Sequence, residues 1–402
     1  MSAFPSNWEA VPLESVAEVR LGRQRSPKNH EGDHMRPYVR AANVGWRGLL
    51  LDDVKQMNFT DSEMDTYRLK VGDLLLNEAS GSATEVGKPA VWRGEIDDCA
   101  FQNTLIRVRP FRVDSDYLLH YFRNQAALKM FAAASRGVGI HHIGREALAS
   151  WIIPLPPIEE QRKIGCLLER ADAVRAKRRE ALENLDELER SVYLEMFGDP
   201  LDNPMNWPIV RLAEVIASPL RNGLSPTSRG NVPAKILTLS SVTGSSFNPS
   251  AYKIASFLSE PPTSQSVRDS DFLICRGNGN LELVGRGFFP PYSMPDTTFP
   301  DTIIAARADL GRVRKEFLEH VWSTAAVRSQ IEASARTTNG TYKVNQTALE
   351  GIAFCLPDID VQYEFATRIE AIRRVRAAQR ASMAELDSLF ASLEVKAFRG
   401  EL

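Results

Sequence analysis

The chain repeats itself, and this internal duplication restricts the possible folds more than any other feature of the sequence. The segment "NWEAVPL" at Asn7 matches "NWPIVRL" at Asn206, and "GDLLL" at Gly72 matches "SDFLI" at Ser270. Further matches follow in the same order, and the offset between matched segments stays nearly constant. The sequence therefore predicts a tandem duplication of one structural unit.

Each copy begins with a globular portion that is rich in short strands. Runs such as "NTLIRVRP" and "DTIIAARA" are separated by Gly, Pro, Asn and Asp, which indicates strands joined by turns. Helical patches interrupt the runs, at "DYLLHYFRNQ" from Asp116 and "EFLEHVW" from Glu316. Each copy is therefore predicted to form an α+β domain with a helical pair beside a sheet.

A long helix follows each globular portion, after the proline-rich segments "PLPP" and "CLPD". In the first helix, one set of residues recurs every seven positions, namely Ile164, Ala171, Arg178, Leu185 and Val192. A second set lies three positions further on, at Leu167, Val174, Ala181 and Leu188, and the second helix has the equivalents Phe365, Ile372, Gln379, Leu386 and Leu393. Helices of about 37 residues would be about 55 Å long, and their apolar stripes need cover.

The simplest cover for each long helix is the other one, which predicts an antiparallel coiled coil with pseudo-twofold symmetry. Arg178 and Gln379 hold the same heptad position near the helix centres, where we expect a polar layer. The symmetry also predicts that the chain ends meet, near Ser6 and Arg399. The predicted order is an α+β domain over 1–158, a helix over 159–199, a second α+β domain over 200–357 and a helix over 358–402.

Composition and motifs argue against several classes of protein. The four cysteines lie far apart without CxxC spacing, which favours buried free thiols in a reducing cytoplasm and gives no metal site. No apolar run approaches the roughly 18 residues of a membrane span, and the start of the chain does not resemble a secretory signal. No Walker, GxSxG or HExxH motif is present, so the sequence offers no catalytic residues. A net charge of -2 means that any contact with nucleic acid must be local.

The candidate binding residues are polar and basic side chains in loops that recur at equivalent positions of the two copies. Arg, Lys, Asn, Thr and His are the residue types that contact base edges and phosphates. In the first copy they are Arg23, Arg25, Lys28, Arg136, His141 and His142, and in the second Arg221, Thr227, Arg229, Arg336, Thr337, Asn339, Tyr342 and Lys343. Because the loops recur while their sequences differ, they suggest two related surfaces that recognise different things.

Other polar features have a simpler structural interpretation. A turn is favoured over a phosphate cradle for "RGNGN" at Arg276, and a polar contact loop is favoured over a metal pair for His141 and His142. Asp73 and Asp271 each precede an apolar run, so capping of a turn is favoured over general-base chemistry.

Three motifs resemble the conserved regions of the specificity subunits of type I restriction-modification enzymes. They are "LPPIEEQRKI" at Leu155, "LEMFGDP" at Leu194 and "ASLEVKAFRGEL" at Ala391. The strand-rich portions resemble the two target-recognition domains of that family, although they match only at scattered points such as "FQNTLIRVRP". The second copy departs from the pattern, because "CLPDIDVQ" lacks one proline and the glutamate before Gln362.

The resemblance implies a non-catalytic subunit that gives a methyltransferase complex its DNA specificity. Each recognition domain would read one half of a bipartite site in double-stranded DNA, and the helices would set the spacer and dock two methyltransferase subunits. This chain would bind no cofactor: S-adenosylmethionine would bind to the methyltransferase, and ATP and Mg²⁺ to a separate restriction subunit. Two alternatives are a coiled-coil adaptor that does not bind DNA and a specificity module of a different methyltransferase or defence system.

Overall fold

The structure, a computed structural model, describes residues 5, 7–82, 84–134, 141–338 and 340–402. It contains two compact units. Unit 1 combines the described residues up to Glu180 with Ala381–Leu402, and unit 2 is Ala181–Arg380. The unit boundaries lie within the two long helices, so the four-part division expected from the sequence stays a prediction.

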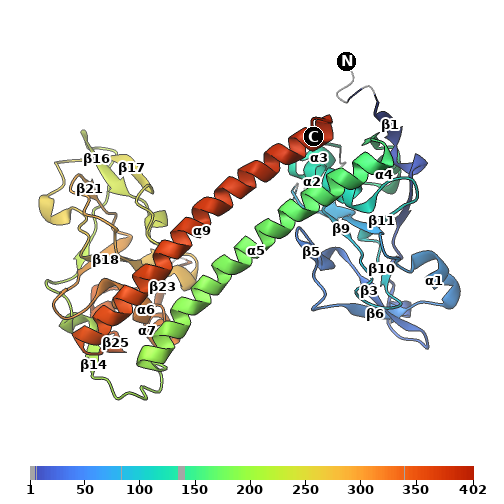
Figure 1. Cartoon of the computed structure of the whole chain (residues 1–402). Helices are drawn as coiled ribbons and strands as arrows, with labels where there is room; N and C mark the ends of the chain where they lie inside the picture. Colours follow the sequence, from blue (N-terminus) through green and yellow to red (C-terminus); the bar gives the residue numbers. More distant parts are fainter. Residues whose placement is uncertain (1–4, 6, 83, 135–140, 339) are drawn as a thin grey trace. The chain divides into compact units, whose positions relative to one another are not determined.

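Unit 1 is built around a four-stranded antiparallel sheet with the order β2-β11-β7-β9. Figure 1 labels β9 and β11 of this sheet. Its strands are Ala17–Leu21 (β2), Leu105–Pro110 (β11), Leu74–Asn77 (β7) and Pro89–Val91 (β9). Because side chains alternate along a strand, Leu74 and Leu76 enter the core that includes α2 (Ser115–Ala127), whereas Leu75 enters a second core with Phe101. Both faces of β7 are therefore buried, which explains its continuous apolar run.

Smaller elements complete the globular part of unit 1. A three-stranded sheet joins β10 (Ala100–Phe101), β3 (Met35–Val39) and β6 (Lys55–Asn58), with β10 parallel to β3. Strand pairs are formed by β1 (Glu9–Pro12) with β13 (Ile152–Leu155), β4 (Val44–Gly45) with β5 (Gly48–Leu49), and β8 (Ala79–Ser80) with β12 (His141–His142). The remaining helices are α1 (Asp61–Tyr67), α3 (Met130–Ala134) and α4 (Arg145–Ala149).

Unit 2 repeats this plan with the same strand order and register. Its main sheet, β15-β22-β18-β20, consists of Arg221–Asn222 (β15), Ile303–Arg307 (β22), Asp271–Cys275 (β18) and Gly287–Phe288 (β20). Phe272 pairs with Ala306 as Leu74 pairs with Val108 in unit 1. The sheet packs against α6 (Lys315–Trp322) and α7 (Ala325–Ser334), so the predicted α+β duplication is confirmed.

Apart from the β4–β5 pair, the smaller sheets of unit 1 also have counterparts in the described part of unit 2. They are formed by β17 (Tyr252–Phe257), β16 (Val232–Leu237) and β21 (Thr297–Thr298), and by β14 (Ile209–Arg211) with β25 (Ala353–Cys355). A third sheet contains β19 (Gly277–Asn278), β24 (Thr341–Lys343) and β23 (Arg336–Thr338), followed by α8 (Gln346–Glu350).

The two long helices, α5 (Ile158–Phe197) and α9 (Ile359–Arg399), contain 40 and 41 residues. Within unit 1, Arg175 of α5 lies 4.2 Å from the ring of Phe390 and 2.6 Å from Asp387, both on α9. Within unit 2, Glu189 of α5 lies 2.8 Å from Arg376 of α9, and Tyr193 contacts Phe365. In unit 2 the residue numbers rise along one helix as they fall along the other, as expected for an antiparallel coiled coil.

The heptad prediction is confirmed for one set of residues and wrong for the other. Members of the first set are buried, as Ile164 and Phe365 are, or half-buried, as Leu185 and Leu386 are. Leu167, Val174 and Leu188 of the second set are 40%, 51% and 45% exposed. The buried stripe is continued by residues four positions after the first set, such as Leu168, because the helix packs on its globular domain as well as on its partner helix.

The repeated glutamine of the proline-rich motif fixes the start of each long helix to its globular domain. The buried Gln161 side chain accepts a hydrogen bond from the Asp114 backbone N–H at 2.8 Å and donates to the Pro156 carbonyl at 2.7 Å. In unit 2, Gln362 accepts from Arg314 N–H at 2.9 Å and donates to the Pro357 carbonyl at 2.8 Å. An apolar residue here would leave buried backbone groups unpaired.

Other expectations for the chain have mixed outcomes. The ends meet as predicted, since Gly400 lies against Pro5 and Trp8; Ser6 itself lies outside the described residues. Arg178 belongs to unit 1 and Gln379 to unit 2, so the polar layer stays a prediction. Three cysteines are buried, but the expectation is wrong for Cys166, which lies on the outer face of α5. None of the described helices is long and apolar enough to span a membrane.

Candidate nucleic-acid interface

In unit 1, backbone hydrogen bonds bring the polar loops together at one edge of the main sheet. Asn103 N–H donates to the Arg23 carbonyl at 3.0 Å, and Glu78 N–H donates to the Thr104 carbonyl at 3.0 Å. Ile143 N–H in turn donates to the Glu78 carbonyl at 2.9 Å. We define the first tip as the described residues 22–30, 78–82, 102–104 and 141–142.

Unit 2 joins the equivalent segments in the same way. Leu224 N–H donates to the Phe299 carbonyl at 2.9 Å, and Arg276 N–H donates to the Thr302 carbonyl at 2.8 Å. Val344 N–H donates to the Arg276 carbonyl at 2.9 Å, which joins the segment after β24 to the segment after β18. The second tip consists of the described residues 221–230, 276–280, 300–302, 336–338 and 340–343. The duplication has therefore preserved a scaffold that brings four separate segments together.

A glycine makes the close approach of these segments possible in each tip. A Cβ atom on Gly22 would collide with the Gln102 carbonyl, and one on Gly223 would collide with the Pro300 carbonyl. At the next residue the chain forms a parallel bridge, between Arg23 and Gln102 in unit 1 and between Leu224 and Pro300 in unit 2. Glycine is therefore required at both positions because it has no side chain, and not because the backbone adopts an unusual φ angle there.

The predicted residues of the first tip differ in their exposure and in whether other side chains already bind them. Arg23 is only 13% exposed; it pairs with Glu63 at 2.6 Å and lies 4.8 Å from the Phe59 ring. Arg25 is exposed and contacts His30, and Lys28 is exposed. His141 and His142 form β12, and His142 Nδ1 lies 3.3 Å from a Glu78 carboxylate oxygen. Arg136 lies outside the described residues.

The predicted residues of the second tip show a similar division. Arg221 is 17% exposed, lies 2.7 Å from Asp271 and donates to the Ser264 carbonyl. Thr227 accepts a hydrogen bond from Arg229 N–H at 3.3 Å, and Arg229 is exposed. The hairpin of β23 and β24 carries the exposed residues Arg336, Thr337 and Lys343, whereas Tyr342 packs against the core. Asn339 lies outside the described residues.

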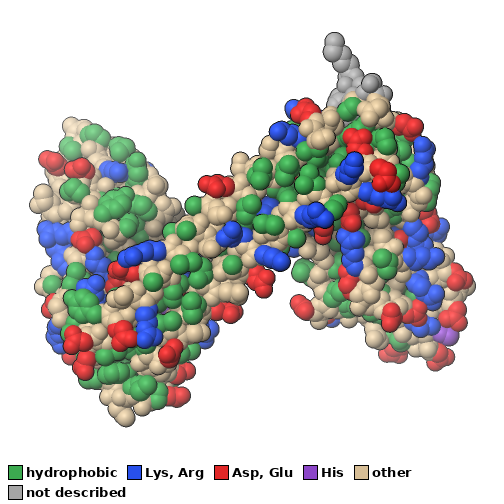
Figure 2. All heavy atoms as spheres, in the orientation of Figure 1, with side chains coloured by type: hydrophobic (Ala, Val, Ile, Leu, Met, Phe, Trp, Pro, Cys, Tyr) green, Lys and Arg blue, Asp and Glu red, His purple; other side chains and the backbone are tan. Residues whose placement is uncertain are grey.

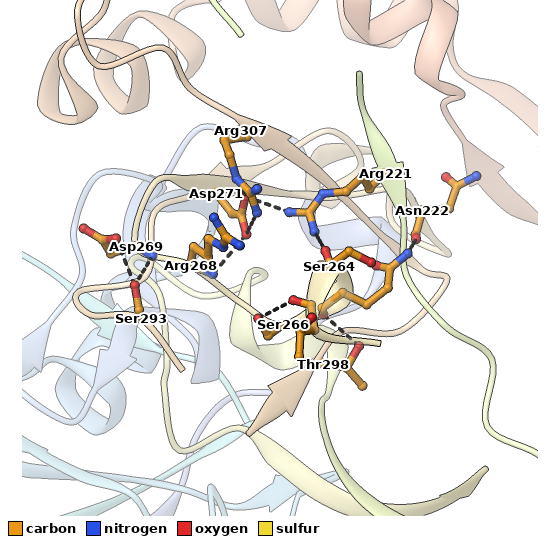
Figure 3. A network of polar contacts seen from close by, with 12 residues as sticks. Arg221, Asn222, Ser264, Ser266, Arg268, Asp269, Asp271, Ser293, Thr298 and Arg307 are labelled. Atoms are coloured by element: carbon orange, nitrogen blue, oxygen red, sulfur yellow. Dashed lines mark hydrogen bonds and ion pairs between the residues drawn. The ribbon is translucent and has the colours of Figure 1, made fainter. Parts of the chain in front are cut away.

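A buried carboxylate holds the main sheet of each unit together at the end opposite the tip. Figure 3 shows Asp271 between the guanidinium groups of Arg221 and Arg307. The distance from Arg307 Nε to Asp271 Oδ1 is 3.0 Å. In unit 1, Asp73 accepts two hydrogen bonds from Arg109, each at 2.7 Å, and these bonds raise the pKa of Arg109. Buried charges require such pairing.

The same two carboxylates cap turns. Asp73 accepts from Lys70 N–H at 2.8 Å, and Asp271 accepts from Arg268 N–H at 3.0 Å. The capping role expected from the sequence is confirmed. The expectation of a turn is confirmed only in part for "RGNGN", Arg276–Asn280: Gly277 and Asn278 form β19, and the chain bends after them, where the Asn280 side chain accepts from Glu282 N–H.

The tips also contain polar residues that were not among those predicted from the sequence, including Glu78 and Asn103 in the first tip and Arg276 and Asp301 in the second. The available signal was a polar difference within matched segments, since "FQNT" aligns with "FPDT". Neither segment is basic, so a search for clusters of Arg and Lys overlooks them.

The charges on the visible faces of both units are mixed. In Figure 2, basic and acidic side chains are interspersed, and apolar side chains reach the surface along the long helices. Among the residues that the structure describes, no group of three His, Cys, Asp or Glu side chains could hold a metal ion. Binding of a polyanion would therefore have to be local to the tips.

Comparison with known proteins gives consistent likenesses. Residues 5–184 match the model of the type I restriction modification DNA specificity domain. The StySPI specificity subunit of Salmonella potsdam and the EcoKI specificity subunit of Escherichia coli (strain K12) are each 24% identical over 423 residues, which cover 99% of this chain and 90% of theirs. A chain in a solved structure of a type I R-M system is 21% identical and aligns over 99% of both chains, with a TM-score of 0.58.

Proposed function

Because this chain belongs to the family of type I restriction-modification specificity subunits, we propose that it supplies the DNA specificity of such a complex and has no catalytic centre of its own. Each tip reads one half of a bipartite site in double-stranded DNA. The observation that carries this proposal is the pair of tips, in which the same backbone scaffold presents different side chains. A duplicated scaffold with changed contact residues is what recognition of two unlike half-sites requires.

Within each tip, we assign contact with DNA to the exposed residues and positioning to the buried ones. Arg25, Lys28, Arg229 and Lys343 are exposed and can reach phosphates or base edges. Arg23 and Arg221 are held by Glu63 and Asp271, so they fix the loops instead. Loss of a positioning residue should disturb a whole half-site rather than one base pair.

The long helices are proposed to dock two methyltransferase subunits and to set the spacer between the half-sites. Exposed apolar residues occur at matching positions of the repeat, since Leu188 and Leu389 are 45% and 56% exposed. Val174 with Val375 and Leu194 with Val395 are further matching pairs. Two equivalent apolar surfaces fit two copies of one partner. S-adenosylmethionine belongs to that partner, and ATP and Mg²⁺ to a restriction subunit.

The proposal is tested by DNA binding of the full chain purified with its methyltransferase subunits. Sites are first defined by comparing methylated adenines in cells with and without this chain. Arg25→Ala should then weaken binding in a gel-shift assay, with a lower salt dependence if Arg25 contacts a phosphate. Arg112→Ala is the matched control, because exposed Arg112 follows β11 at the end opposite the first tip. A complex without salt-dependent, site-specific binding contradicts the proposal and favours the adaptor.

A further inference from the structure

The second tip presents a carboxylate where a DNA-binding surface would ordinarily avoid one. Asp301 is exposed in the turn between β21 and β22, and its backbone carbonyl accepts a hydrogen bond from Arg276 Nη1 at 3.1 Å. Among the described residues, no cation lies within ion-pair distance of the Asp301 side chain. Backbone hydrogen bonds join Leu224 to Phe299 on one side of this turn and Arg276 to Thr302 on the other, so the turn that carries Asp301 lies between two other segments of the tip.

The charge of Asp301 restricts what it can face in a DNA complex. Phosphates carry negative charge, so a carboxylate aimed at the backbone would be repelled. Basic side chains on the other segments of the same tip, Arg229, Arg336 and Lys343, are available for phosphates instead. If these basic side chains bind phosphates, the Asp301 carboxylate needs a hydrogen-bond donor on the DNA itself, and in the grooves of DNA the donors are amino groups of bases.

The pattern of groups in the major groove narrows the choice to cytosine. Guanine presents two acceptors there, and thymine presents an acceptor and a methyl group, so neither offers a donor to a carboxylate. Adenine presents its amino group beside the acceptor N7, which repels an acceptor-only side chain. Cytosine presents the N4 amino group alone. An ionised Asp301 therefore matches cytosine best.

The first tip gives an internal comparison. The residue equivalent to Asp301 is Asn103, whose amide both donates and accepts. The two tips thus differ in hydrogen-bonding capacity at the same point of the scaffold, as reading of unlike half-sites requires.

We propose that Asp301 determines specificity in the second half-site by accepting a hydrogen bond from N4 of a cytosine. This inference rests on the proposed function, because it requires that the second tip contacts DNA. It predicts a cytosine at one position of the second half-site, on the strand that faces the tip.

The test uses the full chain with its methyltransferase subunits and a DNA library in which the second half-site is randomised. Wild-type protein should select a cytosine at one position, and Asp301→Ala should reduce that preference by about tenfold or more. Asp301→Asn preserves the shape and should also lose the preference for cytosine, because its amide can donate. Asp202→Ala removes the same charge from an exposed residue in the loop after α5, and it should leave selection unchanged.

The outcomes separate failure of the inference from failure of the proposed function. If wild-type protein selects a specific second half-site and Asp301→Ala selects the same one equally well, the inference is wrong. The inference is also wrong if Asp301→Ala binds all sequences more tightly with unchanged preference, since Asp301 then only repels the backbone. If the wild-type complex selects no sequence at all, the proposed function itself is contradicted, and with it the basis of the inference.

Discussion

Individual residues set how firmly the two tips are held. Gly22 and Gly223 let separate segments approach so closely that a methyl group would collide with a backbone carbonyl. Asp73 and Asp271 fix the far ends of the strands that carry the tips, through ion pairs with Arg109 and Arg221. The proposed contact residues are thus carried on a backbone that is positioned before DNA arrives, which reduces the entropy lost on binding.

Gly223→Ala tests this close approach. The added methyl group should push the turn at Pro300 away and lower the free energy of unfolding by about 1 to 3 kcal/mol, as overpacking does elsewhere. Urea denaturation of wild type and variant measures the difference. Gly279→Ala is the control in the same tip, because a Cβ there would meet nothing within 4 Å. Equal losses in both variants would show that the contact at Pro300 is unimportant.

Glu394 on α9 makes the stability of unit 1 depend on pH. Burial, with a smaller effect from Asp172, raises its pKa from 4.5 to about 7, although Arg175 acts in the opposite direction. The folded state binds this proton more tightly than the unfolded state, so the contribution of Glu394 to stability falls as pH rises from about 4.5 through 7.

Glu394→Gln should remove this dependence. The variant should melt at a higher temperature than wild type at pH 8 and lose that advantage near pH 5. Glu385→Gln, at an exposed position of the same helix, controls for the loss of a charge. A constant difference between Glu394→Gln and wild type across this range would exclude the proposed effect of Glu394.

At the scale of elements, the long helices have an inner face that stabilises each unit and an outer face available to partners. Phe390 is 7% exposed and contacts Arg175 and His120, whereas its neighbour Leu389 is 56% exposed. Phe390→Ala should therefore cost about 3 to 5 kcal/mol in the free energy of unfolding. Leu389→Ala should change it by less than about 0.5 kcal/mol. Similar losses in urea denaturation would contradict the assignment of faces.

The same helices show how far the sequence could predict the structure. The duplication, the α+β class and the antiparallel helix pair followed from repeated segments and periodicity, because these patterns reflect burial directly. The second heptad set was wrong, since a seven-residue repeat does not reveal that Leu168 packs on a globular domain while Leu167 faces solvent. In the tips, residue type gave Arg23, Arg25, Arg221 and Arg229 equal weight. It could not show that Arg25 and Arg229 are exposed while Arg23 and Arg221 are engaged by distant carboxylates. The role proposed for Asp301 depends on the placement of its turn between two other segments of the tip, which is a tertiary contact that no local pattern reflects.

For the whole molecule, the proposed spacer can be changed through helix length. Inserting one heptad after Leu185 and another after Leu386 adds about 10 Å to each helix and preserves its seven-residue period. The spacer of the methylated site should lengthen by about three base pairs, with unchanged half-sites. The added pairs also rotate one half-site around the DNA axis, so weaker binding alone would not be informative. Full activity at the original spacer would show that helix length does not set the gap.

The path of the chain has a consequence for how unit 1 is completed. Unit 2 is one continuous segment, whereas the core of unit 1 includes Ala397 and Phe398, which follow the whole of unit 2 in the sequence. Unit 1 therefore cannot complete its core until synthesis has passed through unit 2 and on to the far end of α9, while unit 2 needs no residue beyond Arg380. A nascent chain released between Arg380 and Ala397 would contain every residue of unit 2 but an open core in unit 1, whose apolar surface would be exposed to chaperones and proteases. The two units thus depend unequally on the final turns of α9.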